Sequence, residues 1–186
     1  MTAPSTELSV PGYQAATWNI DPVHSEVGFS VRHMMVSKVR GRFTKFSGQL
    51  VTAEEPLQSS VTAEIDLSSI DTGQEQRDQH IKSADFFEVE TYPTMTYKST
   101  GVRVEDGEYI LDGDLTLKGV TRSVPLKLDL QGFGPAAYGG YRAGFTATGE
   151  INRRDFNVSF NAPMANGGVV VGDKIQLQLE IEAVKA

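Results

Sequence analysis

The sequence predicts an all-β protein, an elongated antiparallel β-barrel of eight long strands. Apolar and polar side chains alternate along most of the chain, the alternating segments are mostly ten to twelve residues long, and short turn sequences separate many of them. Eight strands with one apolar face each bury those faces when the sheet closes on itself, which leaves no unpaired edge. A β-sandwich would show the same alternation, but the long strands and short hairpins favour the barrel.

The strands are read from this alternation in chain order. A short strand at 17–20 comes first, and the long strands are expected at 25–36, 39–52, 60–69, 94–104, 108–118, 123–132, 141–152 and 174–184. The Asp-Gly pair in VEDGEY (104–109) and the Lys-Gly pair in KGVTR (118–122) predict tight hairpins. In the second long strand, the apolar parity shifts between Phe43 and Phe46, which predicts a β-bulge.

One helical segment interrupts the strands at about 73–90. Thr72 and Glu75 have the spacing of a capping box, and Pro93 prevents the helix from continuing into the next strand. The segment ends in an aromatic run that includes Phe86 and Phe87. Because exposed aromatic rings forgo about 1.5–3 kcal/mol each of burial energy, we expect both rings to plug one end of the barrel.

The composition limits the organisation and the partners of the protein. A length of 186 residues indicates one domain, with a flexible tail at 1–16 and the barrel at 17–186. The chain has no cysteine, and its net charge of -7 argues against a nucleic-acid partner. The first residues lack the basic start and apolar run of a signal peptide, so a cytoplasmic protein is expected.

Two of the three histidines lie in DPVHSEVGFSVRHMM (21–35). His24 and His33 are nine residues apart on one expected strand, on the order of 30 Å at ~3.3 Å per residue. One metal ion or one reaction centre cannot use both, so no metal site is predicted. His33 shares the parity of the apolar residues and is expected to face the interior, whereas His24 is expected to serve the turn that follows Asp21.

A basic stretch stands out in this acidic chain. No acid occurs from Val27 to Ala53, and the basic residues of the stretch are Arg32, Lys38, Arg40, Arg42 and Lys45. One interpretation is an anionic head group held at a barrel mouth by Arg32, Arg40 and Arg42, because guanidinium forks suit phosphate. The other is an ordinary solvated face, which strand parity favours for Arg40 and Arg42. Both interpretations stay open.

Enzymatic activity is the second function considered, and the sequence does not favour it. It would use the charged residues Arg77, Asp78, Asp85, Arg153, Arg154 and Asp155. These are more simply explained as salt bridges and caps, and the chain shows no nucleophile elbow, phosphate loop or HExxH motif. We therefore expect a protein that is not an enzyme and needs no cofactor.

Several stretches together resemble the YceI-like, polyisoprenoid-binding family of bacteria, over roughly 17–184. The stretches are IDPVHSEVGFSVRHMMVSKVRGRFTKFSG, SSIDTGQEQRDQHIKSADFFEVETYPTMTYKST, LDGDLTLKGVTRSVPL, GFTATGEINRRDF and VGDKIQLQLEIEA. The resemblance implies a lipocalin-like barrel with a helical segment and a long apolar lumen. It also implies an isoprenoid ligand, such as a polyprenyl pyrophosphate or a quinone tail, and a homodimer.

The expected function is therefore to carry or sequester a long-chain isoprenoid lipid in the lumen. Small inward residues such as Gly41, Gly113 and Ala143 are interpreted as leaving room for it. The alternative is a non-catalytic stress or interaction protein whose barrel is packed solid. The residues expected to bind the lipid are Val27, Phe29, Val31, His33, Phe43, Ile65, Leu67, Met95, Tyr97, Leu115, Leu117, Phe145, Leu177 and Leu179.

Overall fold

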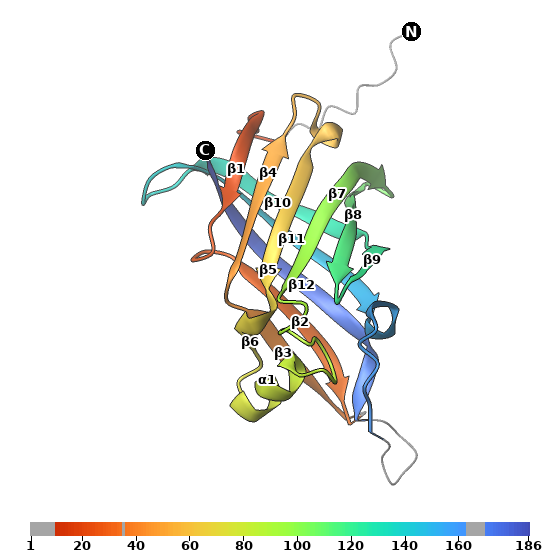
Figure 1. Ribbon diagram of the computed structural model, residues 1–186. Coiled ribbons are helices and arrows are strands. Elements are labelled where there is room, and N and C mark those ends of the chain that lie inside the picture. The colour runs from red at the N-terminus through yellow and green to blue at the C-terminus, as the bar shows by residue number, and fades with distance from the viewer. Residues whose placement is uncertain (1–9, 35, 163–169) are drawn as a thin grey trace.

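The computed structural model describes residues 10–34, 36–162 and 170–186, which form one long barrel of antiparallel strands (Figure 1). The strands are β1 (Ala16–Ile20), β2 (Glu26–His33), β3 (Ser37–Phe43), β4 (Phe46–Thr52), β5 (Ser60–Asp66), β6 (Ile70–Asp71), β7 (Thr94–Glu105), β8 (Glu108–Leu117), β9 (Val120–Ser123), β10 (Leu126–Pro135), β11 (Tyr141–Asn152) and β12 (Val171–Lys185). The helices are α1 (Glu75–Lys82) and the 3-10 turns η1 (Pro56–Gln58), η2 (Leu67–Ser69) and η3 (Arg153–Phe156).

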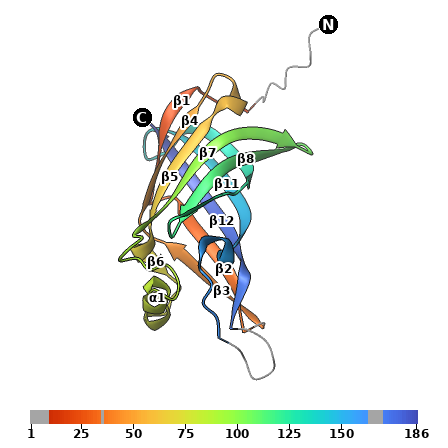
Figure 2. The same cartoon turned by 45° about the vertical axis from the view of Figure 1, so that its right-hand side comes forward.

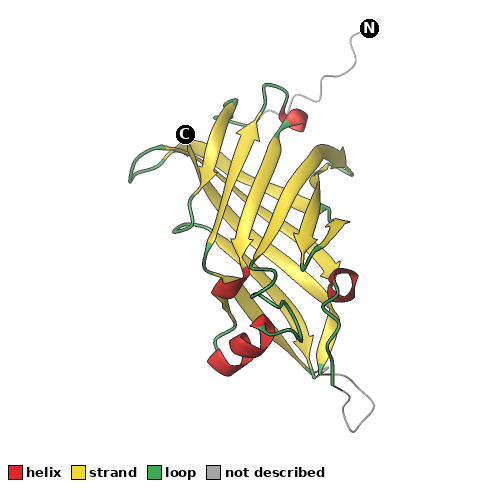
Figure 3. Cartoon of the chain, in the orientation of Figure 1, coloured by secondary structure: helices red, strands yellow, loops and turns green. Residues whose placement is uncertain are grey.

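Eight of these strands form a closed ring. The order is β1, β4, β5, β7, β8, β10, β11 and β12, and β12 pairs back with β1, where Trp18 lies opposite Lys185. This confirms the predicted eight-stranded antiparallel barrel. Helices occur only at the ends of strands and in connections (Figure 3), and no helix in the described part of the chain is long and apolar enough to span a membrane.

The barrel continues beyond the ring on one side only. The predicted strand 39–52 does not run through a bulge but breaks at Thr44 and Lys45. Its first part, β3, pairs with β2 and with the short β6, and its second part, β4, pairs with β1 and β5. Residues 21–25 make a matching break between β1 and β2, which both pair with β12. The lower half in Figures 1 and 2 is thus walled by β12, β2, β3 and β6, with α1 beside β6.

The helix is shorter than the sequence predicted. Within the expected segment 73–90, α1 covers only Glu75–Lys82, and turns follow it. The capping-box prediction is wrong, because Gln74 is the N-cap residue and no side chain caps the helix. The amide and the hydroxyl of Thr72 instead donate to Oδ1 of the buried Asp78, at 2.9 and 2.5 Å. The Thr72 hydroxyl is therefore already committed to the turn before the helix.

The turn predictions are confirmed. Asp106 and Gly107 have φ of 52° and 79°, and Lys118 and Gly119 have φ of 50° and 76°, as two-residue hairpins with a right-handed twist require. Each pair joins strands that are directly opposed, Glu105 with Glu108 and Leu117 with Val120.

The predicted N-terminal tail is only partly described, since residues 1–9 lie outside the described residues. Residues 10–15 are not a free tail but pack against the barrel. The Tyr13 hydroxyl donates to the Ala53 carbonyl at 2.6 Å, and its ring lies edge-on to Phe133 at 5.3 Å. The Tyr141 hydroxyl donates to the Gly12 carbonyl at 2.5 Å. This segment therefore covers the upper end of the barrel.

Candidate functional site: an apolar lumen with a basic mouth

The upper end of the barrel, which we call the closed end, is packed solid. Its centre is Trp18, which is fully buried and donates from Nε1 to the Thr52 hydroxyl at 2.8 Å. Phe133 meets the indole edge-on at 5.6 Å, and Ala143 and Ala183 are completely buried in the same cluster. Because the two alanines are short, the paired strands β11 and β12 leave space that the indole fills. The lumen is therefore filled by side chains at this end.

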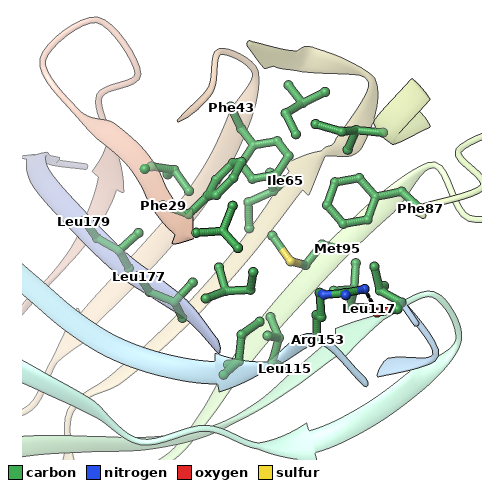
Figure 4. A pocket seen from close by; sticks show the side chains of 18 of the residues that line it. Phe29, Phe43, Ile65, Phe87, Met95, Leu115, Leu117, Arg153, Leu177 and Leu179 are labelled. Carbon is green, nitrogen blue, oxygen red and sulfur yellow. Dashed lines mark hydrogen bonds between the residues drawn. The ribbon is translucent and has the colours of Figure 1, made fainter. Parts of the chain in front are cut away.

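The rest of the lumen is hollow. A cavity of about 710 Å³ runs below the closed end and is lined mainly by aliphatic and aromatic side chains from every long strand (Figure 4). Phe29 and Phe43 approach it from one wall, Leu177 and Leu179 from another, and Met95 lies between them. A volume of this size is within the ~300–1,000 Å³ range of small-molecule sites. The cavity therefore has the size and chemistry of a binding site for an apolar ligand.

Strand parity placed the lumen residues well. All the side chains expected to bind the lipid line the cavity except Leu67. The prediction that Leu67 faces the lumen is wrong, because β5 ends at Asp66. The Asp66 carboxylate accepts a hydrogen bond from the Ser68 amide at 2.9 Å and starts the turn η2. The turn moves Leu67 off the strand parity and buries it completely in the wall. Phe145, Ile65 and Tyr97 are buried as well as lining the cavity.

The interpretation of the small inward residues was wrong. A Cβ at Gly41 would lie 2.4 Å from the ring of Phe29, and a Cβ at Gly113 would lie 2.4 Å from the ring of Tyr97. These glycines do not leave empty space for a ligand, because neighbouring aromatic rings lie flat against their backbones. The hollow instead lies between the tips of the large side chains.

Phe86 and Phe87 close the cavity beside α1, as predicted. Both rings line it, Phe86 is buried, and the ring of Phe87 lies 6.3 Å from that of Phe43 on β3. Phe86 also meets His80 and Phe160 edge-on, at 5.1 and 5.3 Å. The turns after α1 thus substitute for a strand where the sheet stops at β6.

The polar lining gathers at the lower end of the cavity, which we call the mouth. Its charged or titratable members are Arg32, His33, Arg77, His80 and Arg153, and Gln74 and Gln76 accompany them. Within the described residues, no aspartate or glutamate lines the cavity. The mouth is therefore a basic and hydrogen-bond-donating rim on an apolar lumen.

The three arginines assigned to a head group separate in the structure. Arg32 borders the cavity at the mouth, but its side chain has the outward parity of β2 and is exposed, as are those of Arg40 and Arg42, which do not border the cavity. Both lie exposed on the outer face of β3, as the solvated-face interpretation had it, and Arg42 faces Asp71 at 3.7 Å. Their place in the lumen site is taken by Arg77 on α1. Sequence parity could not find Arg77, because only the tertiary fold brings α1 to the mouth.

Arg153 lines the cavity without being free to bind a ligand. Its guanidinium is buried and donates to the carbonyls of Val158 and Phe160 at 2.8 Å and of Gly172 at 2.9 Å. A further contact reaches the Val171 carbonyl at 3.4 Å. Burial lowers the pKa of this guanidinium from its usual value. Arg153 therefore fixes two passing segments of backbone at one side of the mouth.

The other charged residues considered for catalysis also make structural contacts. Arg77 donates to the hydroxyl and carbonyl of Thr72 at 2.8 and 2.7 Å, and Asp85 accepts from His80 at 2.8 Å. Arg154 reaches Asp173 at 2.8 Å. These contacts fix the ends of α1 and η3, as the simpler interpretation of the sequence predicted.

The two histidines of the opening stretch lie apart. His33 lines the cavity at the mouth, and His24 is in the turn between β1 and β2, where Nδ1 lies 2.8 Å from Asp21 Oδ2. The sequence did not reveal that Glu182 lies beside Asp21 and His24. One carboxylate oxygen of each acid and one ring nitrogen of His24 all lie within 4.8 Å of one another. Arg142 already lies among these groups and donates to Asp21 at 2.7 Å and to Glu182 at 3.4 Å. The cluster is thus an ion-pair network at the strand break.

Comparison with known proteins identifies the family. A family model described as the YceI-like domain matches residues 18–183. The chain belongs to the YceI-like family. Two bacterial relatives of this YceI-like chain support the assignment: protein plu2095 of Photorhabdus laumondii is 39% identical over 84% of this chain and 83% of its own length. Protein YceI of Escherichia coli O157:H7 is 35% identical over 100% of this chain and 95% of its own length.

Solved structures of YceI-like proteins and their neighbours share the fold. BcnA of Burkholderia cenocepacia aligns with a TM-score of 0.75 at 26% identity, covering 89% of this chain and 99% of that one. A YCEI protein of Campylobacter jejuni aligns with a TM-score of 0.70 at 26% identity, covering 83% of this chain and 90% of that one. A polyisoprenoid binding domain of Saccharophagus degradans aligns with a TM-score of 0.66, covering 93% of this chain and 100% of that one. At 17% identity, this likeness shows the fold alone.

Proposed function

We propose that this YceI-like protein binds a long apolar lipid of the isoprenoid class in its lumen and carries or sequesters it without chemical change. The observation that carries the proposal is the cavity of about 710 Å³, which is lined mainly by apolar side chains and carries its charged residues at the mouth. The Saccharophagus degradans neighbour, described as a polyisoprenoid binding domain, supports the ligand class. The hollow lumen does not favour the alternative of a solidly packed barrel.

The polar end of the ligand belongs at the mouth. Arg77 lines the cavity and keeps N–H groups beyond the two that bind Thr72. His33 adds an imidazole from the end of β2. These donors suit an anionic or hydrogen-bond-accepting head, such as a pyrophosphate or a quinone carbonyl. The closed end suits the far terminus of the tail, because the cluster around Trp18 is mainly apolar.

The experiment is a binding series on protein freed of co-purifying lipid by organic extraction. Isoprenoid alcohols of increasing length test the lumen, because burial contributes ~25 cal/mol per Å² of apolar area until the cavity is full. The corresponding diphosphates test the mouth. We expect affinity to rise with length and then level off, and the extract to contain a long-chain lipid. Affinity that does not depend on chain length would contradict the proposal.

Arg77→Gln separates the head from the tail. It should weaken binding of a diphosphate and leave binding of the alcohol of the same length unchanged. Arg42→Gln is the matched control, because it removes the same charge without touching the cavity. If both variants weakened diphosphate binding equally, the mouth would have no special role in head-group binding.

A further inference from the structure

The turn between β2 and β3 exposes apolar side chains beside the mouth. Among the described residues, the side chain of Val36 is 86% exposed and that of Met34 is 43% exposed. Met34 takes a left-handed backbone with φ of 53°, and its amide donates to the Val170 carbonyl at 2.8 Å. An exposed valine alone is ordinary. Here Met34 and Val36 both lie in the turn that joins β2 to β3 (the two strands are at the lower end in Figure 2), and we call these two residues the apolar tip.

Cations lie directly behind the apolar tip. Arg32 on β2 and Lys38 on β3 are opposite one another in the strand register, and Arg40 follows on the same outer face. Like charges placed opposite each other destabilise a strand pair. Within the described residues none of the three forms an ion pair, whereas Arg42 faces Asp71 and Arg154 faces Asp173. A hairpin that carries unpaired cations in a chain of net charge -7 indicates an anionic partner.

The apolar tip and its cations lie at the place where a lipid must leave the lumen. His33, Val39 and Val170 line the mouth, and they flank the apolar tip in the chain or by hydrogen bond. The opposite end is closed by the Trp18 cluster. An apolar ligand that passed from this mouth into water would lose its burial energy, so contact between the mouth and a bilayer removes that barrier.

We propose that the apolar tip docks the mouth on a membrane with anionic lipid head groups. Met34 and Val36 enter the interfacial region, and Lys38 and Arg40 lie at head-group level. The arrangement fits a bilayer better than an acidic protein, because the apolar residues lie in the turn beyond the last strand pair and the cations lie on the strands behind them, in the order of the layers of a membrane surface. The inference extends the proposed function, but docking is measured without any ligand in the lumen.

The first test is sedimentation of lipid-free protein with vesicles of phosphatidylcholine, with and without phosphatidylglycerol. We expect binding only to the anionic vesicles, and its loss at about 1 M salt, where charges are screened beyond ~3 Å. Lys38→Gln with Arg40→Gln should lower the partition coefficient about 25-fold, since each cation near an anionic surface contributes about fivefold. Neither residue lines the cavity, so binding of an isoprenoid alcohol should stay at the wild-type level.

Matched controls come from the rest of the barrel. Lys98→Gln with Lys127→Gln produces the same net charge away from the apolar tip and should leave vesicle binding unchanged. Val36→Ser should lower binding about fivefold through lost apolar burial. Val104→Ser changes another exposed valine, at the β7–β8 hairpin, and should have no effect.

The absence of cysteine makes a positional readout available. A solvent-sensitive fluorophore on Val36→Cys should shift to the blue with anionic vesicles, and the same fluorophore on Val104→Cys should not. Equal losses for the tip and control variants would overturn the proposal, as would equal binding to both kinds of vesicle. Wild-type protein that remained in the supernatant would also overturn it, even if the lumen still bound the isoprenoid alcohol.

Discussion

The two ends of the barrel follow the same alternation of apolar and polar residues, yet one is solid and the other is hollow. At the closed end, Ala143 and Ala183 lie beside Trp18, and short and long side chains fill each other's space. Around the cavity, Val27, Leu177 and Leu179 project inward and remain partly accessible from the lumen. Parity decides which side chains face inward, and the pairing of sizes across the lumen decides whether they meet.

The largest effect should come from placing a charge in the hollow part. Met95→Arg directs a guanidinium into the apolar lumen, where burying an unpaired charge is strongly unfavourable. We expect it to abolish binding of an isoprenoid alcohol in a fluorescence or calorimetric titration. Thr96→Arg is the control, since Thr96 is the exposed neighbour on β7 and should bind like the wild type. Binding by Met95→Arg with full affinity would show that the ligand lies elsewhere.

The second prediction compares truncations at the two ends. Trp18→Ala should lower the free energy of unfolding by about 3–5 kcal/mol, because it opens a cavity in a fully packed cluster. Leu177→Ala should lower the free energy of unfolding by at most about 2 kcal/mol, at the low end of the range for leucine truncation. Its effect is smaller because part of the Leu177 side chain already faces the lumen. Urea unfolding followed by circular dichroism measures both. Equal losses would mean that the lumen is as tightly packed as the closed end.

The third prediction tests the close approach of rings to glycine. Gly113→Ala places a Cβ 2.4 Å from the Tyr97 ring, whose hydroxyl is held by the Val124 carbonyl at 2.8 Å. The ring cannot move without losing that bond, so we expect a loss of about 1–3 kcal/mol in the same unfolding assay. Gly101→Ala meets nothing within 4 Å and is the control. If the two variants were equally stable, the Tyr97 ring would be able to move away from the new Cβ without cost, which would contradict the prediction.

The smallest effect concerns the break between the two halves. Arg142 and His24 bind Asp21 and hold the pKa of its carboxyl well below its ordinary value. Since the unfolded carboxyl titrates near 3.9, the ionised form stabilises the fold fully above about pH 4 and progressively less as the pH falls below it. Asp21→Asn should cost on the order of 1 kcal/mol at neutral pH. That difference should shrink in acid, and a difference independent of pH would contradict the assignment.

The sequence predicted the eight-stranded barrel and nearly the whole lumen because both depend on a local period of two. It failed where a side-chain hydrogen bond overrides the local pattern of apolar and polar residues. Asp78 withdraws Thr72 from the helix cap, and the turn at Asp66 moves Leu67 out of the lumen. The mouth was predicted only in part, because Arg77 reaches it on a helix whose position depends on the break after Phe43. No local pattern in the sequence encodes that placement.

The seam between β1 and β12 has a consequence for the way the molecule is made. Trp18 and Ile20 pair with Lys185 and Ala183, so the first strand of the ring is completed by the last strand of the ring. The seven-strand precursor has two open edges until β12 has left the ribosome, and contacts of such large sequence separation form slowly. During that interval, the half-built sheet is exposed to pairing with other chains. A nascent or C-terminally truncated chain should therefore depend on chaperones far more than the finished barrel does.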